Sequence, residues 1–169
     1  MDARDELVVV FGGSSGIGEA VARTMAARGS RVVIVGRDPG RLAAAASRAG
    51  GDVGTAAVNA GDRDAVDAFF GALAVNVDHL VLSFSTGRAG GPFRDLSMAD
   101  LAAAIHGKLI AYLSVLQAAL PGLRSDGSVT LVGAGSAESA LPATAGLAAV
   151  NAGCTRPCGR SRWSWRRCG

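Results

Sequence analysis

The stretch Gly12-Gly13-Ser14-Ser15-Gly16-Ile17-Gly18 decides the fold, because it joins an apolar run to an amphipathic segment. The run before it, Leu7–Phe11, is unbroken and apolar, as in a parallel strand covered on both faces. Residues 16–28 carry apolar side chains at helical spacing, and Gly29 follows them as a helix-ending glycine. A glycine-rich turn between a strand and a helix predicts a pyrophosphate site, built from backbone N–H groups and the helix dipole.

The residue types within this loop suit a phosphate better than a merely structural turn. Gly12 lets the chain turn, Gly16 lets the backbone approach the phosphates, and Gly18 lets the helix pack on the strand. Serine hydroxyls add hydrogen-bond donors. The candidate cofactor-binding residues of the loop are Gly12, Ser14, Ser15, Gly16, Ile17 and Gly18.

Strands and helices alternate along the rest of the chain. Further strands are predicted at 31–35, 53–58, 78–84 and 128–132. Helices are predicted at 38–49, from 62 to about 75, from 97 to about 120, and from about 144. Asp38, Asp62 and Ser97 are the expected N-caps. This order predicts an α/β fold with right-handed crossovers and a doubly wound parallel sheet.

The net charge of +3 comes from the end of the chain. Residues 154–169 hold five arginines and no acidic residue, whereas the rest has 12 basic and 14 acidic residues. We therefore do not expect nucleic acid as a partner, although a basic arm with Trp163 and Trp165 stays open as an alternative. The three cysteines, Cys154, Cys158 and Cys168, show no paired zinc-site spacing, so no metal is expected.

Apolar residues make up 49% of the sequence, but they do not form a continuous run long enough to span a membrane. No run approaches the ~18 residues that such a span requires. No segment has the pattern of a signal peptide either. We expect a cytoplasmic protein.

The spacing G-x-x-x-G-x-G resembles the T-G-x-x-x-G-I-G fingerprint of the short-chain dehydrogenase/reductase family, with Phe11 in place of the threonine. The resemblance covers residues 5 to about 152. It implies a Rossmann-like sheet of about five strands in the order 3-2-1-4-5, within an NADP(H)-binding domain over residues 1–152. It also implies hydride transfer between a nicotinamide cofactor and a carbonyl or alcohol substrate.

The end of the second predicted strand, Val35-Gly36-Arg37, favours NADP(H) over NAD(H). An acidic residue there would bind the ribose 2′-hydroxyl of NAD, whereas arginine pairs with the 2′-phosphate of NADP. Arg37 is the candidate, Arg41 a second one, and an ordinary solvated arginine the alternative. The resemblance adds Asn59 beside the adenine and Ser83 at the end of the fourth strand.

The catalytic positions that the resemblance implies are replaced. The tyrosine that protonates the substrate falls on Leu147, and the lysine four residues later falls on Asn151. The serine thirteen residues before the tyrosine falls on Ala134. Leucine and alanine cannot transfer a proton, so no intact catalytic set is present. The only tyrosine, Tyr112, lies inside the long predicted helix and is interpreted as a packing residue.

Two other residues remain as weaker candidates. Lys108 stands where the family has the asparagine of its proton relay, and it acts as an acid or an electrostatic group if it is desolvated. Its alternative is a surface lysine. Ser136 lies two residues past the serine position and is within reach of a ligand oxygen. Its alternative is a plain loop serine.

The tail 153–169 departs from the resemblance. Read one nucleotide earlier with GC-rich codons, it can encode LHAALRPLAVELAPVR, similar to the family's helix ending A-L-A-x-E-L-A-P. We interpret the tail as a frameshift product; a genuine irregular tail is the alternative. The chain is then truncated and lacks the last two strands, which leaves an uncovered apolar helix face and predicts poor solubility. The resemblance implies a homo-oligomer for full-length family members, but it does not extend this expectation to a chain that lacks these strands.

Two functions follow from the sequence. The first is an NADP(H)-dependent oxidoreductase by descent, acting on an unidentified small molecule and inactive in this chain. The second is a non-catalytic NADP(H)-binding pseudoenzyme or scaffold. The sequence does not predict the substrate, because the segments that select it are absent or not recognisable.

Overall fold

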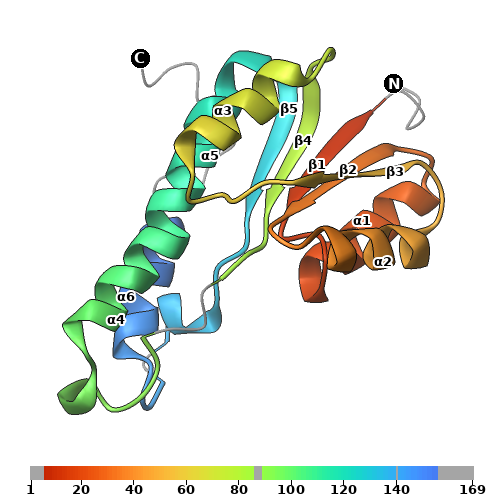
Figure 1. Ribbon diagram of the computed structural model, residues 1–169. Helices are drawn as coiled ribbons and strands as arrows, with labels where there is room; N and C mark the ends of the chain where they lie inside the picture. The colour runs from red at the N-terminus through yellow and green to blue at the C-terminus, as the bar shows by residue number, and fades with distance from the viewer. Residues whose placement is uncertain (1–5, 86–88, 140, 156–169) are drawn as a thin grey trace. The chain divides into compact units, whose positions relative to one another are not determined.

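The computed structural model describes residues 6–85, 89–139 and 141–155. Five strands form one sheet in the order β3-β2-β1-β4-β5 (Figure 1). β1 pairs in parallel with β2 and β4, and β2 pairs in parallel with β3. The strands are β1 Leu7–Phe11, β2 Arg31–Gly36, β3 Val53–Ala57, β4 Val77–Leu82 and β5 Leu123–Leu131. The strand order and the α/β class predicted from the sequence are confirmed.

Helices connect these strands, as the alternating pattern predicts. They are α1 Gly16–Ala27, α2 Pro39–Ala49, α3 Arg63–Ala72, α4 Met98–Ala104, α5 Ala111–Ala119 and α6 Ala145–Thr155. A π-helical segment, Ile105–Ile110, joins α4 to α5. Short 3₁₀ turns cover Phe93–Asp95, Leu120–Gly122 and Gly135–Ala137.

The three predicted N-caps all accept a hydrogen bond from the first turn of their helix. Asp38 accepts from the Arg41 N–H at 3.0 Å, and Asp62 accepts from the Ala65 N–H at 3.1 Å. Ser97 accepts from the N–H of the third helical residue of α4. Each cap satisfies a backbone donor that has no partner within the helix, which explains why these helices begin where they do.

The largest differences from the prediction are two element boundaries and the interior of one helix. β5 begins at Leu123, five residues before the predicted start, although the run Ser125-Asp126-Gly127 looks like a turn. At Gly127 a Cβ atom would stand only 2.6 Å from the Asp78 carbonyl oxygen, so glycine lets β5 approach β4. The third helix ends at Ala72 rather than near residue 75, because Leu73 is already extended. The long helix predicted from residue 97 contains the π-helical segment.

The chain divides into two compact units, each with its own packing. Unit 1 is Met1–Phe84 with Ser114–Thr130, and unit 2 is Ser85–Leu113 with Leu131–Gly169. In unit 1, α1 and α2 cover the same face of the sheet (Figure 1). Their core consists of Val8, Val10, Ala22, Ala26, Val32, Ile34, Leu42, Ala45 and Val81.

Unit 2 has a smaller core, built around Ala104 and Val150 together with Ala89. Glycine lets α6 pack closely there. A Cβ at Gly146 would stand 2.7 Å from the Ala89 carbonyl oxygen, and one at Gly153 would stand 2.8 Å from a Leu109 methyl carbon. α6 continues to Thr155, so the first residues of the tail 153–169 are helical. The remainder of the basic tail, residues 156–169, lies outside the described residues.

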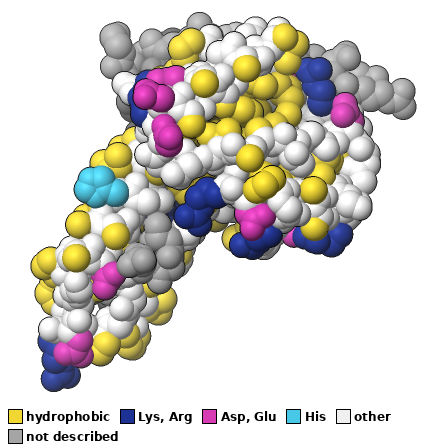
Figure 2. All heavy atoms as spheres, in the orientation of Figure 1, with side chains coloured by type: hydrophobic (Ala, Val, Ile, Leu, Met, Phe, Trp, Pro, Cys, Tyr) yellow, Lys and Arg dark blue, Asp and Glu magenta, His cyan; other side chains and the backbone are white. Residues whose placement is uncertain are grey.

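One helical segment is longer and more apolar than inspection of the sequence indicated. Met98–Gly122 is 25 residues long, its most apolar window has a mean hydropathy of 1.4, and 33% of that window is buried. A core helix of a non-membrane protein passes the same test, so the segment is weak evidence for a membrane span. Figure 2 shows many hydrophobic side chains at the surface. The large exposed ones include Phe93, Met98, Ile110 and Leu141.

Asp78 ties together the starts of three strands in unit 1. Its carboxylate accepts a hydrogen bond from the Leu7 N–H at 2.8 Å and forms an ion pair with the Arg124 guanidinium at 3.0 Å. The residue is only 6% exposed. Asp126 pairs with the same arginine, also at 3.0 Å, but its side chain is 60% exposed. Burial therefore makes Asp78 the more important partner.

We expect Asp78→Ala to lower the free energy of unfolding by about 2–3 kcal/mol, because a buried N–H loses its acceptor and a partly buried ion pair is broken. The matched control, Asp126→Ala, removes the exposed partner of the same arginine and changes the free energy by less than about 0.5 kcal/mol. Urea denaturation followed by circular dichroism measures both. Equal effects of the two substitutions would contradict the importance of burial.

Candidate functional site

The glycine loop begins at the end of β1, which lies between β2 and β4 in the sheet. Gly12 has a φ of +83° and donates its N–H to the Val35 carbonyl at 2.8 Å. A Cβ at Gly12 would collide with the Ser83 carbonyl oxygen. Ser83 in turn donates its N–H to the Phe11 carbonyl at 2.9 Å. Only glycine fits this position, because both the backbone angle and the space exclude a side chain.

The other two glycines of the fingerprint differ in their surroundings. A Cβ at Gly18 would collide with the Gly12 carbonyl oxygen, so α1 rests directly on the turn. Gly16 has a φ of +56°, and no atom lies within 4 Å of the place where a Cβ would stand. Gly18 therefore serves packing, while the backbone of Gly16 is open to solvent or to a ligand.

The first turn of α1 has no side-chain cap. Ser15 is the N-cap residue, but its hydroxyl makes no capping hydrogen bond, and its backbone is extended. Ser14 is half-buried, whereas Ser15 and Ile17 are exposed, Ile17 to 59%. The free N–H groups of a helix start attract an anion. The loop thus leaves backbone donors for a ligand rather than satisfying them internally.

Arg37 and Asn59 follow the ends of β2 and β3, as predicted. Arg37 is exposed and has no ion pair within the described part of the chain. The neighbouring Asp38 carboxylate accepts from the Arg41 N–H as the α2 cap. Asn59 is exposed, and its Oδ1 accepts from the Gly61 N–H at 3.1 Å. Because the Asn59 Oδ1 is used in that turn, the NH₂ group of the same amide remains available as a hydrogen-bond donor.

Phe11, which replaces the family's threonine, is part of an aromatic cluster. Its buried ring packs edge-on to Phe69 at 5.7 Å and stacks on Phe70 at 5.9 Å between ring centroids. Phe84 lies 6.5 Å away. Phe11 therefore lacks the hydroxyl that threonine would place in the turn, and its ring packs against α3 instead.

In unit 2, the three catalytic positions of the resemblance have different environments. Ala134 is exposed and precedes the 3₁₀ turn Gly135–Ala137. Leu147 is half-buried in α6, and a Cβ at Gly90 would stand 3.7 Å from its Cδ1. Asn151, one turn further along α6, is 5% exposed. Neither Ala134 nor Leu147 has a group that can donate a proton.

The two weaker candidates meet at Asn151. Lys108 donates from Nζ to the Asn151 Oδ1 at 2.7 Å, and the Asn151 Nδ2 donates to the Ser136 Oγ at 3.2 Å. Lys108 and Ser136 are each 7% exposed. Lys108 is therefore not a surface lysine, and Ser136 is a buried residue of a 3₁₀ turn. The sequence analysis missed the Lys108–Asn151 pair, although its signal was present: the two residues occupy exchanged family positions.

The surroundings of Lys108 are apolar on one side. Its Nζ lies 5.5 Å from the centre of the Tyr112 ring, which is buried, and the Tyr112 hydroxyl donates to the Val132 carbonyl at 3.2 Å. Tyr112 is thus a buried residue of its helix, and its hydroxyl is bonded to the backbone at Val132. Burial lowers the pKa of Lys108, an effect that Cys154 partly opposes. Burial raises the pKa of the Cys154 thiol, which favours its neutral form.

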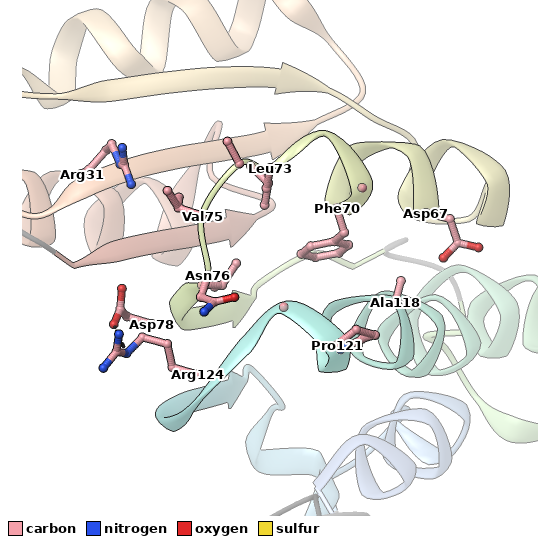
Figure 3. A pocket seen from close by; sticks show the side chains of 14 residues that line it. Arg31, Asp67, Phe70, Leu73, Val75, Asn76, Asp78, Ala118, Pro121 and Arg124 are labelled. Carbon is pink, nitrogen blue, oxygen red and sulfur yellow. Dashed lines mark ion pairs between the residues drawn. The ribbon is translucent and has the colours of Figure 1, made fainter.

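A pocket of about 680 Å³ lies elsewhere in unit 1, at the edge where the strands begin (Figure 3). Its lining includes Phe70, Leu73 and Pro121 on the apolar side, and Asp78 faces Arg124 across one end. Ligands of doubly wound sheets bind at the opposite edge, where the strands end. The pocket is therefore separate from the glycine loop.

Comparison with known proteins agrees with this geometry. The short chain dehydrogenase family matches residues 6–155. A bovine (Bos taurus) 3-oxoacyl-[acyl-carrier-protein] reductase is 56% identical over 48 residues, which are 28% of this chain and 20% of that protein. The (2S)-[(R)-hydroxy(phenyl)methyl]succinyl-CoA dehydrogenase subunit BbsC of Thauera aromatica is 35% identical over 133 residues, 75% of this chain and 52% of that one.

Solved structures give the same result. A short chain dehydrogenase/reductase family protein superimposes with a TM-score of 0.82 at 31% identity, covering 90% of this chain and 65% of that chain. A short chain dehydrogenase from Bacillus anthracis gives 0.77 at 27% identity, with 90% and 65% covered. The chain thus spans about half or less of these two curated relatives and about two thirds of these structures. On the fold, the glycine loop and these matches, the chain belongs to the short-chain dehydrogenase family.

Proposed function

We propose that the chain binds NADP(H) through the glycine loop of unit 1. Members of its family bind nicotinamide dinucleotides. The observation that carries the proposal is the uncapped start of α1 beside Gly16, where a backbone with positive φ stands in open space. Backbone N–H groups there, together with the Ser14 and Ser15 hydroxyls, suit a pyrophosphate.

The residues after β2 favour NADP(H) over NAD(H) as the cofactor. Arg37 presents an exposed guanidinium without an ion pair in the described residues, so it is available for a 2′-phosphate. Asp38 would repel that phosphate, but its carboxylate is directed at the first turn of α2. The Asn59 NH₂ group is a donor for the adenine ring, and Ser83 completes the proposed contact set.

The oxidoreductase reaction of the family is hydride transfer between the bound nicotinamide and a carbonyl or alcohol substrate. We propose that this chain does not perform it by the tyrosine-dependent route, because Leu147 and Ala134 carry no proton donor. The names of two relatives suggest a substrate class, since one is a 3-oxoacyl-[acyl-carrier-protein] reductase and the other is a subunit of a succinyl-CoA-type dehydrogenase. An acyl thioester with a 3-keto group is therefore the first compound to test.

A non-catalytic NADP(H)-binding module is the second candidate. The observation that favours it is the half-buried leucine at the acid position, which packs in α6 without any polar group of its own. Such a module senses or carries the cofactor rather than transferring a hydride. We further propose a cytoplasmic location and no nucleic-acid partner.

Arg37→Ala is expected to weaken NADPH binding roughly tenfold or more, because charge-assisted hydrogen bonds to the 2′-phosphate are lost. NADH binding changes less than about twofold, since NADH has no phosphate at that position. Fluorescence titration with each cofactor measures both constants. The control, Arg28→Ala, removes an exposed arginine after the far end of α1. An equal effect of Arg37→Ala on both cofactors would argue against its role.

Gly18→Ala is expected to weaken NADPH and NADH binding alike, roughly tenfold or more. Its new methyl group collides with the Gly12 carbonyl and moves the N–H donors of α1 away from the pyrophosphate. Gly71→Ala is the matched control, because nothing lies within 4 Å of its Cβ position on α3. The same titration applies. Unchanged affinity in Gly18→Ala would remove the loop from the proposed site.

The wild-type chain is expected to bind NADPH without oxidising it when acetoacetyl-CoA and a panel of aldehydes and ketones are added. The reason is the missing proton donor at positions 134 and 147. Absorbance at the NADPH band over several hours measures turnover, and a family member with an intact tyrosine–lysine pair is the positive control. NADPH oxidation that Arg37→Ala and Gly18→Ala both reduce would show that the chain is an active enzyme.

A further inference from the structure

The pocket at the edge of unit 1 where the strands begin has a charged end and an apolar wall (Figure 3). Arg31, Asp78 and Arg124 lie at one end of it, while Phe70 and Pro121 lie toward the other. Its volume of about 680 Å³ is that of a small-molecule site, and such sites combine apolar walls with a few polar groups. All of its lining residues belong to unit 1, so the pocket is a feature of one compact unit.

The pairing of the strands explains why two charged residues stand at this end. Leu7, the first residue of β1, is in register with Arg31 of β2. On the other side of β1, Val8 is in register with His79 of β4. Leu7 therefore lies beside Asp78. Arg31 and Asp78 thus flank the start of β1 on its two neighbouring strands.

The carboxylate at this end is already neutralised, whereas one guanidinium is not. Asp78 accepts from the Leu7 N–H at 2.8 Å and forms an ion pair with Arg124 at 3.0 Å. Arg31 is exposed, and its side chain forms no ion pair or hydrogen bond within residues 6–85, 89–139 and 141–155. Two arginines share this end of the pocket with a single buried carboxylate, so the charge of Arg31 remains uncompensated.

The other acidic residue of the lining does not change this balance. Asp67 forms an ion pair with Arg63, one turn earlier in α3, at 2.7 Å. Figure 3 places Asp67 at the end of the pocket away from Arg31. A guanidinium binds a carboxylate through two parallel charge-assisted hydrogen bonds, whereas it repels a cation. The charges of the lining therefore favour a ligand with one negative group.

The apolar wall favours a ligand with a hydrocarbon body. The ring of Phe70 stacks on Phe11 at 5.9 Å between ring centroids and is half-buried, so part of it remains uncovered. Leu73 is also half-buried, and Val75 is 46% exposed. A hydrocarbon chain that covers these side chains removes apolar surface from water, which stabilises the complex.

We propose that this pocket binds a monocarboxylic acid with an apolar body, such as a medium-chain fatty acid. The carboxylate pairs with Arg31, and the hydrocarbon chain packs against Phe70 and Leu73. The site lies at the edge of the sheet opposite the glycine loop. It goes beyond the proposed function, because it requires neither a dinucleotide nor turnover.

The test uses the full chain and two probes of equal chain length, octanoate and octylammonium. Calorimetry at neutral pH measures the affinity for each. In the wild type, we expect octanoate to bind about tenfold or more tightly than octylammonium, because only the carboxylate complements Arg31. Arg31→Ala should weaken octanoate binding about fivefold or more, and Arg31→Lys, which keeps the charge but not the fork of donors, should retain part of the affinity.

Arg31→Glu separates a role in binding from a role in folding. The new carboxylate repels octanoate and attracts octylammonium, so we expect the preference between the two probes to reverse. A variant that merely unfolds would lose both. Ala74→Trp places a large ring at an exposed position of the pocket lining and should weaken octanoate binding about fivefold by occupying the space. Arg28→Ala is the control, because Arg28 is an exposed arginine outside the lining, and it should behave as wild type.

Octanoate binding that weakens in Arg31→Ala and Ala74→Trp, with a reversed preference in Arg31→Glu, supports the inference. No octanoate binding by the wild type at millimolar concentration, equal binding of the two probes, or wild-type affinity in Arg31→Ala overturns it. NADP⁺ is titrated into the same samples, and we expect these variants to bind it as the wild type does. If NADP⁺ binds and octanoate does not, only this inference fails; if octanoate binds and NADP⁺ does not, only the proposed function fails.

Discussion

Unit 1 depends on the absence of side chains at two glycines after β1. Gly12 lies against the Ser83 carbonyl and donates to the Val35 carbonyl, while Gly18 lies against the carbonyl of Gly12 itself. β2, β4 and α1 therefore meet β1 at a single point that leaves no room for a Cβ. Gly16, between these two glycines in the sequence, has no atom within 4 Å of the place where a Cβ would stand. A loop suited to phosphates is thus a consequence of how the sheet and its first helix pack.

Unit 2 is organised around a different constraint, a buried charge. The Lys108 ammonium is removed from water without a carboxylate partner in the described residues, and an amide from another helix satisfies it instead. Relative to the family pattern that the sequence resembles, lysine and asparagine have exchanged positions, and in this chain the two side chains are in contact. The positive charge lies on the π-helical segment.

Much of the fold was predictable because it depends on local rules. The unbroken apolar run of β1 and the caps Asp38 and Asp62 act within a few residues, and their elements begin as expected. The start of β5 was not predictable, since the turn-like residues around Gly127 belong to a strand only because Asp78 lies beside them. Likewise, no local pattern marks the π-helical segment.

For the candidate site, the sequence by itself determined the glycine loop, Arg37 after β2, and the loss of a proton donor at Ala134 and Leu147. These features depend on residue type at a fixed spacing, which the chain carries without folding. Only the tertiary structure decided that Lys108, Asn151 and Ser136 form one buried, directional network. Residues 43 and 15 positions apart come into contact through packing of separate segments, and burial, which sets the chemistry of a lysine, exists only once those segments have packed.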